Sequence, residues 1–402
     1  MSAGARFDAP ALLLAGGRVV TGDGVLDDAW VQVDEGAIVA VAERRPAADA
    51  PVIDLDGAWL LPGYIDLHVH GGGGHSVAAS PQAMEAAVAF HRTRGTTATL
   101  VSLVTAPVDE LVVQAGWVAA LTRRGPTARG CVLGAHLEGP FLSPRRRGAQ
   151  NAAHMIEPDL EVLDRLIAAG EGELRMMTLA PELDGALGMI PRLRENGIIA
   201  AIGHSDATYE QAKEAIAAGA NHATHLFNGM GPLHHRSPGL VGAALEAGIA
   251  SELINDGRHL HPAVISLVCG LIDCPVLITD AIDAAGVGDG TFDLGGLAVH
   301  VRDGEARLAS TRSLAGSTLT MDDALRRAVR DSGLPIERAA AAAATNPARV
   351  LGLQDRLGSI APGRRADLVV LDDELQVERV MAAGEWVPHD VLEQAHIGLD
   401  NQ

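Results

Sequence analysis

The sequence contains few cysteines, and their spacing gives no sign of a structural cross-link. Cys131, Cys269 and Cys274 are the three cysteines among 402 residues, and none belongs to a CxxC pair. An odd number without metal-binding spacing argues against a disulfide framework and against a thiolate metal site. A reduced, cytoplasmic setting is therefore expected.

Long apolar runs and positive charge are also scarce. No run approaches the ~18 apolar residues of a membrane span, and the N-terminus shows only the short patch ALLLA without a signal-peptide layout. The 31 Lys and Arg residues against 51 Asp and Glu residues give a net charge of −20. Neither nucleic acid nor a membrane is therefore an expected partner, and an anionic ligand would need a local cluster of arginines or backbone N–H groups.

The two ends of the chain share a pattern of short β-like runs. Residues 11–59 contain such runs, broken by turn signals, and the stretch GSIAPGRRADLVVLDDELQVERVMAAGEWV near the C-terminus resembles them. A chain of this length fits one large domain and a smaller one. We therefore predict a small β-sandwich domain formed by the N- and C-terminal segments, residues 1–62 and 358–402.

The middle of the chain alternates β runs with amphipathic helices. Eight β runs can be counted, namely YIDLHVH, TATLVSLV, CVLGAHLEG, RMMTLAPE, GIIAAIGHS, HATHLFNG, ASELINDG and CPVLITDA. Helix signals lie between most of them; Ser80 and Pro81, for example, open a helix that Gly95 ends. This alternation predicts an α/β fold, a (β/α)8 TIM barrel over residues 63–357. The alternative is a doubly wound open sheet, which is disfavoured because no GxGxxG fingerprint follows the first strand.

Chemically versatile side chains stand at the ends of most of these predicted strands. They are His68 and His70 on the first strand, Glu138 on the third, His204 on the fifth, His225 on the sixth, His259 just after the seventh and Asp280 on the eighth. In a TIM barrel the active site lies at the carboxyl ends of the strands, so we expect these side chains to meet. His68 and His70 are two residues apart and would point to the same face of a strand.

Histidine and carboxylate ligands without a thiolate suit Zn²⁺, with Fe²⁺ as the alternative. Glu138, His204 and His225 can supply the three protein ligands of a catalytic site that keeps one position open for water. An ion held in this way would lower the pKa of that water towards ~7.

Each residue taken singly also has a structural interpretation. Glu138 could cap a helix or pair with an arginine, and Asp280 could be a helix N-cap. His136, two residues before Glu138, could support the site from behind or be structural, and we treat His222 as structural. The co-occurrence of the ordered set favours a metal site.

Several segments of the sequence resemble a known family. They are PGYIDLHVHGGGG, AHLEGPFL, IGHSDA, ATHLFNGM, LINDGRHL, LITDAI and LAGSTLTM, with the closing TNPARVLGL. In this order they resemble the amidohydrolase superfamily, and within it the N-acetylglucosamine-6-phosphate deacetylases, over essentially the whole chain. The single lysine, Lys213, lies in a predicted helix after the fifth strand. It cannot serve as the carboxylated lysine that bridges two metals in hydantoinases, so Glu138 is the candidate bridging ligand.

The resemblance implies hydrolysis of N-acetyl-D-glucosamine 6-phosphate to D-glucosamine 6-phosphate and acetate. Asp280 would act as general base towards the water and then as general acid towards the leaving amine. His259 would help to stabilise the oxyanion. Asn228, the backbone N–H of Gly229 and Arg236 would bind the phosphate, with Arg236 donated across a homodimer interface. Gln150 stands where relatives commonly carry a histidine that contacts the substrate.

Three other functions remain open at this point. The machinery could act on N-acetylgalactosamine 6-phosphate, since epimers differ in the direction of one hydroxyl, or on an unphosphorylated N-acyl compound. The barrel could also be a non-catalytic binding module, although such proteins are expected to lose ligands that are all present here. Similar deacetylases can lack the histidine pair, so His68 and His70 predict a second ion bridged by Glu138, giving one or two ions per subunit.

Overall fold

A β-sheet built from both ends of the chain forms one side of the molecule. The computed structural model describes residues 11–126 and 131–388, so the outer parts of the predicted β domain, residues 1–10 and 389–402, lie outside the described residues. The eight strands of this sheet follow the order β21-β20-β19-β5-β1-β2-β3, with β4 pairing with β1. Their bounds are β1 Leu12–Thr21, β2 Gly24–Asp34, β3 Ala37–Ala42, β4 Val52–Asp54, β5 Trp59–Pro62, β19 Leu368–Leu371, β20 Val377–Ala382 and β21 Glu385–Trp386.

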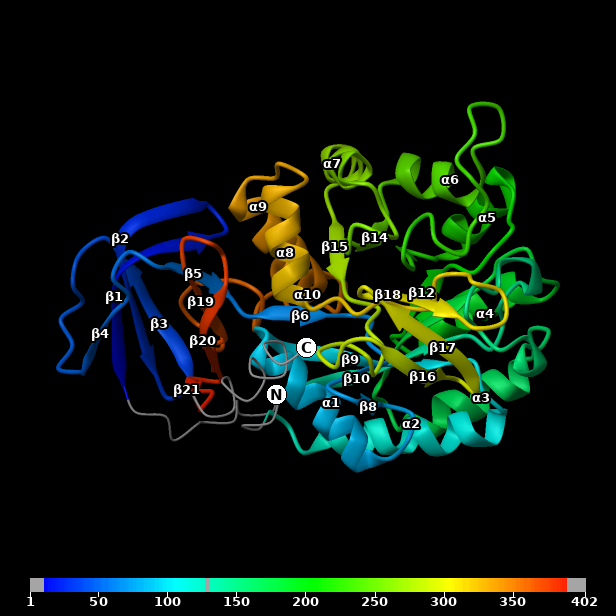
Figure 1. Ribbon diagram of the computed structural model, residues 1–402, viewed down its shortest axis with the longest axis horizontal. Coiled ribbons are helices and arrows are strands. Elements are labelled where there is room, and N and C mark those ends of the chain that lie inside the picture. Colours follow the sequence, from blue (N-terminus) through cyan, green and yellow to red (C-terminus); the bar gives the residue numbers. More distant parts are fainter. Residues whose placement is uncertain (1–10, 127–130, 389–402) are drawn as a thin grey trace.

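This sheet has its own apolar core, which explains why the two ends of the chain come together. Leu14, Val31 and Val33 from the N-terminal strands pack with Leu368 and Val370 from the C-terminal ones. The pairing of β5 with β19 joins the two segments directly. The predicted sandwich-like β domain from both ends of the chain is confirmed (Figure 1). Its predicted limits at residues 62 and 358 stay a prediction.

The second sheet is a barrel of parallel strands. Its order is β15-β14-β13-β12-β11-β10-β9-β6, which is the order of the eight predicted runs read backwards. The bounds are β6 Tyr64–Asp66, β9 Thr96–Val104, β10 Val132–Glu138, β11 Leu174–Leu179, β12 Ile199–Ile202, β13 His222–Ala223, β14 Ala250–Ile254 and β15 Pro275–Ile278. A parallel bridge between Val69 and Ala281 links the first strand to the last beyond their ends. The predicted TIM barrel is confirmed.

Helices follow most barrel strands and cover their outer side (Figure 1). Ser80 caps α1 by accepting from the N–H of Ala83, and Thr208 with Gln211 forms a capping box at the start of α5. The bounds are α1 Pro81–Thr93, α2 Val108–Arg123, α3 Leu160–Ala169, α4 Ala186–Glu195, α5 Tyr209–Ala218, α6 Gly239–Ala247, α7 Pro262–Leu271, α8 Met321–Arg330, α9 Ile336–Ala340 and α10 Asn346–Val350. Within the described residues, no helix is long and apolar enough to cross a membrane.

The structure also contains short elements that the sequence analysis did not predict. The most important is a three-stranded antiparallel sheet between the last barrel strand and α8, made of β16 Gly290–Leu294, β17 Leu297–Arg302 and β18 Glu305–Leu308. The remaining ones are the hairpin β7 Gly71–Gly72 with β8 His75–Ser76, the 3₁₀ turns Pro144–Arg146 and Ala152–His154, and the π-helical turn Ala341–Thr345. The three-stranded sheet matters for function because it borders the site.

Candidate metal centre and active site

The carboxyl ends of the barrel strands bring the predicted residues together. Glu138 is the last residue of β10, and His204, His225 and Asp280 each follow a barrel strand by two residues. The backbone of these last three residues is left-handed, with φ of 46° at His204, 25° at His225 and 51° at Asp280. Such strain in residues other than glycine persists only where the surrounding structure holds it, and it is typical of functional sites.

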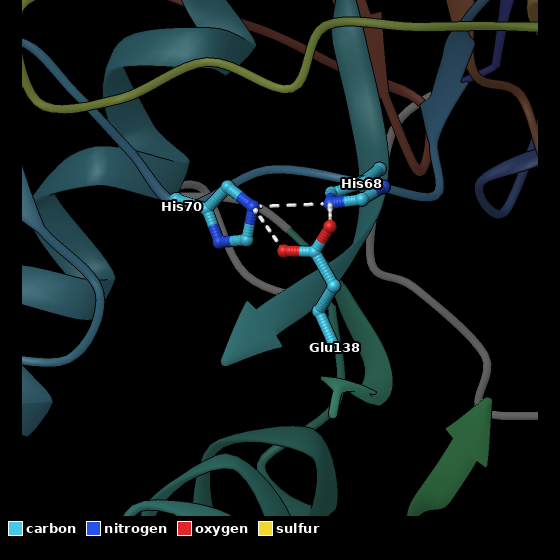
Figure 2. Close-up of side chains that lie close together, drawn as sticks. All are labelled: His68, His70 and Glu138. Atoms are coloured by element: carbon cyan, nitrogen blue, oxygen red, sulfur yellow. Dashed lines mark hydrogen bonds and ion pairs between the residues drawn. The ribbon is translucent and has the colours of Figure 1, made fainter. Parts of the chain in front are cut away.

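Glu138 lies at the centre of two groups of side chains. Its Oε1 is 3.0 Å from Nε2 of His204 and 2.9 Å from Nε2 of His225. Its Oε2 is 3.3 Å from Nε2 of His70, and its Oε1 is 3.5 Å from Nε2 of His68 (Figure 2). In each group the three potential ligand atoms lie within 4.8 Å of one another, and all five residues are buried. One carboxylate is thus shared by two clusters of ligand type.

The histidine rings turn one particular nitrogen towards this centre. Nδ1 of His70 donates to the carbonyl of Ser102 at 3.0 Å, and Nδ1 of His204 donates to the carbonyl of Arg146 at 2.9 Å. A neutral ring that donates from Nδ1 presents a lone pair at Nε2. Yet Nε2 of His68 and His70 lie 3.0 Å apart, and Nε2 of His204 and His225 lie 3.1 Å apart. Lone pairs this close repel each other unless a proton or a metal ion lies between them, and nitrogen and oxygen donors arranged in this way fit divalent metal ions.

The charges of the site lead to the same conclusion. The ion pairs of Glu138, Asp280 and Glu252 in the described part of the chain are all with histidines. Burial disfavours charge on Asp280, but the neighbouring His68 and His70 hold its pKa below its ordinary value. Burial likewise opposes protonation of His70, but Asp280 and Glu138 raise its pKa to about 9. The buried carboxylates of the site are stabilised in their ionised form only by nearby positive charge, which protons on the histidines or metal ions can supply.

A cavity of about 220 Å³ opens onto this centre. Its lining contains most of the predicted site residues, namely His70, Glu138, Gln150, His204, His225, Asn228, Gly229, His259 and Asp280. His259 is held in place by Asp256, whose carboxylate accepts from its Nδ1 at 2.7 Å. Gln150 accepts from the N–H of Thr105 at 2.8 Å and donates its amide to Glu138.

Arg236 is the predicted site residue that lies apart from this cavity. Its guanidinium is exposed and lies 2.7 Å from Nε2 of His235. The loop that carries it, between α5 and α6, extends away from the body of the barrel (Figure 1). Within a single chain, therefore, the described residues do not bring Arg236 to the site.

Sequence reasoning missed two sets of residues that lie in or beside the site. Leu294, Ser313 and Leu314 from the three-stranded sheet and its exit line the cavity. Glu252 in the middle of β14 is fully buried and accepts from Nδ1 of His68 at 3.0 Å. A single charged residue inside a predicted barrel strand, as in ASELIN, is the signal that could have found it, because a buried charge requires a partner.

The positions of Glu138, Asp280 and His136 bear on the structural interpretations given above. Among the described residues Glu138 contacts no arginine, and no helix starts at Asp280, since a loop and β16 follow it. His136 bonds Ser102 through Nδ1 at 3.0 Å and Thr178 through Nε2 at 2.8 Å, and its ring packs edge-on against His68. It therefore supports the site from behind.

Comparisons with known proteins agree with this site. The Amidohydrolase family profile matches residues 59–387. An N-acetylgalactosamine-6-phosphate deacetylase of Escherichia coli O157:H7 is 41% identical over 92% of this chain and 97% of its own length. An N-acetylglucosamine-6-phosphate deacetylase of Vibrio furnissii is 38% identical over 92% and 93%.

A solved structure of the same kind aligns over nearly the whole fold. It is an N-acetyl-D-glucosamine-6-phosphate deacetylase variant from Mycobacterium smegmatis in complex with N-acetyl-D-glucosamine 6-phosphate. It is 42% identical, with a TM-score of 0.89, and the match covers 94% of this chain and 99% of that one. An enamidase with 18% identity and a TM-score of 0.62 shares the fold.

Proposed function

This chain belongs to the amidohydrolase family and is a hydrolytic enzyme, and on that premise we propose that it deacetylates an amino sugar phosphate. The substrate is N-acetyl-D-glucosamine 6-phosphate, and the products are D-glucosamine 6-phosphate and acetate. The proposal rests mainly on one observation. Oε1 of Glu138 lies within 3.0 Å of Nε2 of both His204 and His225, and all three residues line the cavity.

Glu138, His204 and His225 would hold the first ion, and His68, His70 and the same Glu138 would hold a second. Both groups offer nitrogen and oxygen donors without thiolate, which suits Zn²⁺ first and Fe²⁺ as the alternative. A divalent ion bound there supplies positive charge that acidifies a water molecule and polarises the amide carbonyl. The shared glutamate allows one or two ions per chain.

Asp280 transfers a proton from the attacking water to the leaving amine. Its carboxylate lines the cavity, and Oδ1 lies 3.1 Å from Nε2 of His70. A lowered pKa keeps it ionised at neutral pH, so that it accepts a proton from the attacking water. It then returns that proton to the nitrogen of the breaking amide, because an unprotonated amine is a poor leaving group.

Other lining residues position the acetamide. His259 lines the cavity and is fixed by Asp256 through Nδ1, which leaves Nε2 to stabilise the developing oxyanion. Leu294 and Leu314 offer an apolar surface suited to the acetyl methyl group. Gln150 donates its amide to Glu138 and lines the cavity, where it would contact the substrate.

The phosphate is bound by Asn228, the backbone of Gly229 and Arg236. Arg236 comes from the partner subunit of a homodimer, which explains why it lies outside the cavity of its own chain. The exposed Leu233, three residues before it and 46% accessible, is consistent with an interface at this loop. A cytoplasmic location accords with the three free cysteines.

One experiment tests this function directly. Acetate release is measured on N-acetylglucosamine 6-phosphate, N-acetylgalactosamine 6-phosphate and unphosphorylated N-acetylglucosamine, together with the metal content of the same preparation. We expect the highest kcat/KM on the gluco phosphate. The 41% identity to an N-acetylgalactosamine-6-phosphate deacetylase makes the galacto epimer the second candidate, and a clear preference for it would replace the first. Equal rates on the unphosphorylated sugar would remove the phosphate from the proposal.

A further inference from the structure

Glu252 is a buried charge that the proposed chemistry does not use. It lies in the middle of β14, its side chain has no accessible surface, and it does not line the cavity. A carboxylate removed from water in this way is strongly disfavoured unless its oxygens are hydrogen-bonded. The partners of Glu252 therefore indicate what keeps it there.

Each oxygen of Glu252 is occupied, and the donors are informative. Oε2 accepts from Nδ1 of His68 and from the backbone N–H of His225, both at 3.0 Å. Oε1 accepts from Nε2 of His222, also at 3.0 Å. His68 belongs to one of the two ligand groups and His225 to the other. One buried carboxylate oxygen thus contacts a residue from each of the two ligand groups.

The contact with His68 decides which nitrogen that ring offers to the site. Because Nδ1 donates to Glu252, the neutral ring carries its lone pair on Nε2, which lies 3.0 Å from Nε2 of His70. Without Glu252, a neutral His68 could carry its proton on Nε2 instead and would offer no lone pair to an ion. Packing alone does not select between these two tautomers.

We infer that Glu252 is a positioning residue that holds His68 as a ligand for the second metal ion. It acts through His68 and contacts neither the substrate nor the cavity. The inference rests on the two-ion form of the proposed site and adds to it the residue on which occupancy of the second position depends.

The experiment compares two substitutions in zinc-loaded protein equilibrated in zinc buffers, with bound zinc measured at each free concentration. Glu252→Asp keeps the charge but shortens the side chain, so it cannot reach Nδ1 of His68. Glu252→Gln removes the charge but keeps an acceptor oxygen at the same reach. We expect Glu252→Asp to weaken binding of the second zinc by about 10- to 100-fold, the usual effect of losing such a support. Glu252→Gln should weaken it less.

Two outcomes would overturn the inference. Wild-type affinity in Glu252→Asp would show that the hydrogen bond is dispensable, and a larger loss in Glu252→Gln than in Glu252→Asp would show that charge matters and position does not. Asp322→Asn is the matched control, since Asp322 is also buried but lies on α8 away from the ligands. It should bind zinc as the wild type does.

A double-mutant cycle separates positioning from general damage to the fold. If Glu252 acts through His68, Glu252→Asp should cause no further loss of zinc in a His68→Asn background. Additive losses would contradict the inference. Zinc binding is measured without substrate, so the result stands apart from acetate release, which tests the proposed function.

Discussion

Nε2 of His68 lies 3.0 Å from Nε2 of His70, and the other nitrogen of each ring is already committed to an acceptor. Two neutral rings in this arrangement would direct lone pairs at each other. Positive charge beside the pair would relieve this repulsion, and Glu138 belongs to both groups of potential ligands.

Replacing this pair tests how many ions the chain holds. The variant His68→Asn with His70→Asn should lose one metal ion per chain and keep the ion held by Glu138, His204 and His225. Deacetylation should persist, because the remaining group retains three ligands and Asp280. Metal analysis and acetate release measure both quantities. His75→Asn, an exposed histidine nearby, is the control. An unchanged metal count and rate in the double variant would show that the pair has no part in catalysis.

Asp280→Asn should nearly abolish turnover while the metal content stays close to that of the wild type. A general acid–base residue contributes about 10²- to 10⁴-fold to the rate, so kcat should fall within that range. The amide keeps the shape of the side chain but cannot accept the proton. Steady-state kinetics and metal analysis on the same sample decide the matter. A variant that kept its metal and more than a tenth of the wild-type kcat would assign proton transfer to another residue.

His259 should affect kcat more than KM. Its Nδ1 is fixed by Asp256 at 2.7 Å, so the ring is oriented before the substrate arrives. His259→Gln should lower kcat by about 10²- to 10³-fold, the effect of losing one oxyanion donor. Asp256→Asn should cause a smaller loss of kcat, since the ring remains but is held less firmly. A change in KM alone for both variants would place His259 in ground-state binding.

Arg236→Ala should weaken use of phosphorylated substrates selectively. A hydrogen bond to a charged group contributes about 1.5–3 kcal/mol, so kcat/KM on the sugar phosphate should drop by about 10- to 100-fold. The low rate on the unphosphorylated sugar should not change. Lys213→Ala is the control, because Lys213 is an exposed cation paired with Glu246. An unaltered kcat/KM for the sugar phosphate in Arg236→Ala would argue against a phosphate role for this residue.

The strand-end residues could be predicted because their placement follows from two simple rules. His68 and His70 are two residues apart just beyond β6, and the carboxyl ends of parallel strands meet at one end of a barrel. Glu252 was not predicted because its hydrogen-bond partners come from other strands of the barrel. The sequence of its own strand does not reveal these partners. The sheet β16–β18 escaped because its short strands resemble a glycine-rich loop. Arg236 was assigned to the phosphate from the family resemblance and not from local pattern, and it lies outside the cavity of its own chain.

The buried His91 leads to a prediction of how the stability of the folded state depends on pH. It is buried on α1, Nε2 donates to the carbonyl of Gly71 at 2.8 Å, and Nδ1 has no partner among the described residues. Burial lowers the pKa of His91 to about 4, whereas an unfolded histidine titrates near ~6.5. Between these values the unfolded chain binds the extra proton, so the folded state loses stability as pH falls from about 6.5 towards 4. The loss is about 1.4 kcal/mol per pH unit.

His91→Gln isolates this effect, because the amide can still donate to Gly71 but does not titrate. At pH 7.5 we expect similar thermal midpoints for the two proteins, apart from a fixed offset. On acidification to pH 5 the wild type should lose about 2 kcal/mol more than the variant, from the 1.5 units below the unfolded pKa. The contributions of other groups, such as the buried His136, are present in both proteins and cancel. Thermal midpoints measured at half-unit intervals would reveal this divergence, and parallel curves down to pH 5 would mean that His91 is not held neutral by the fold.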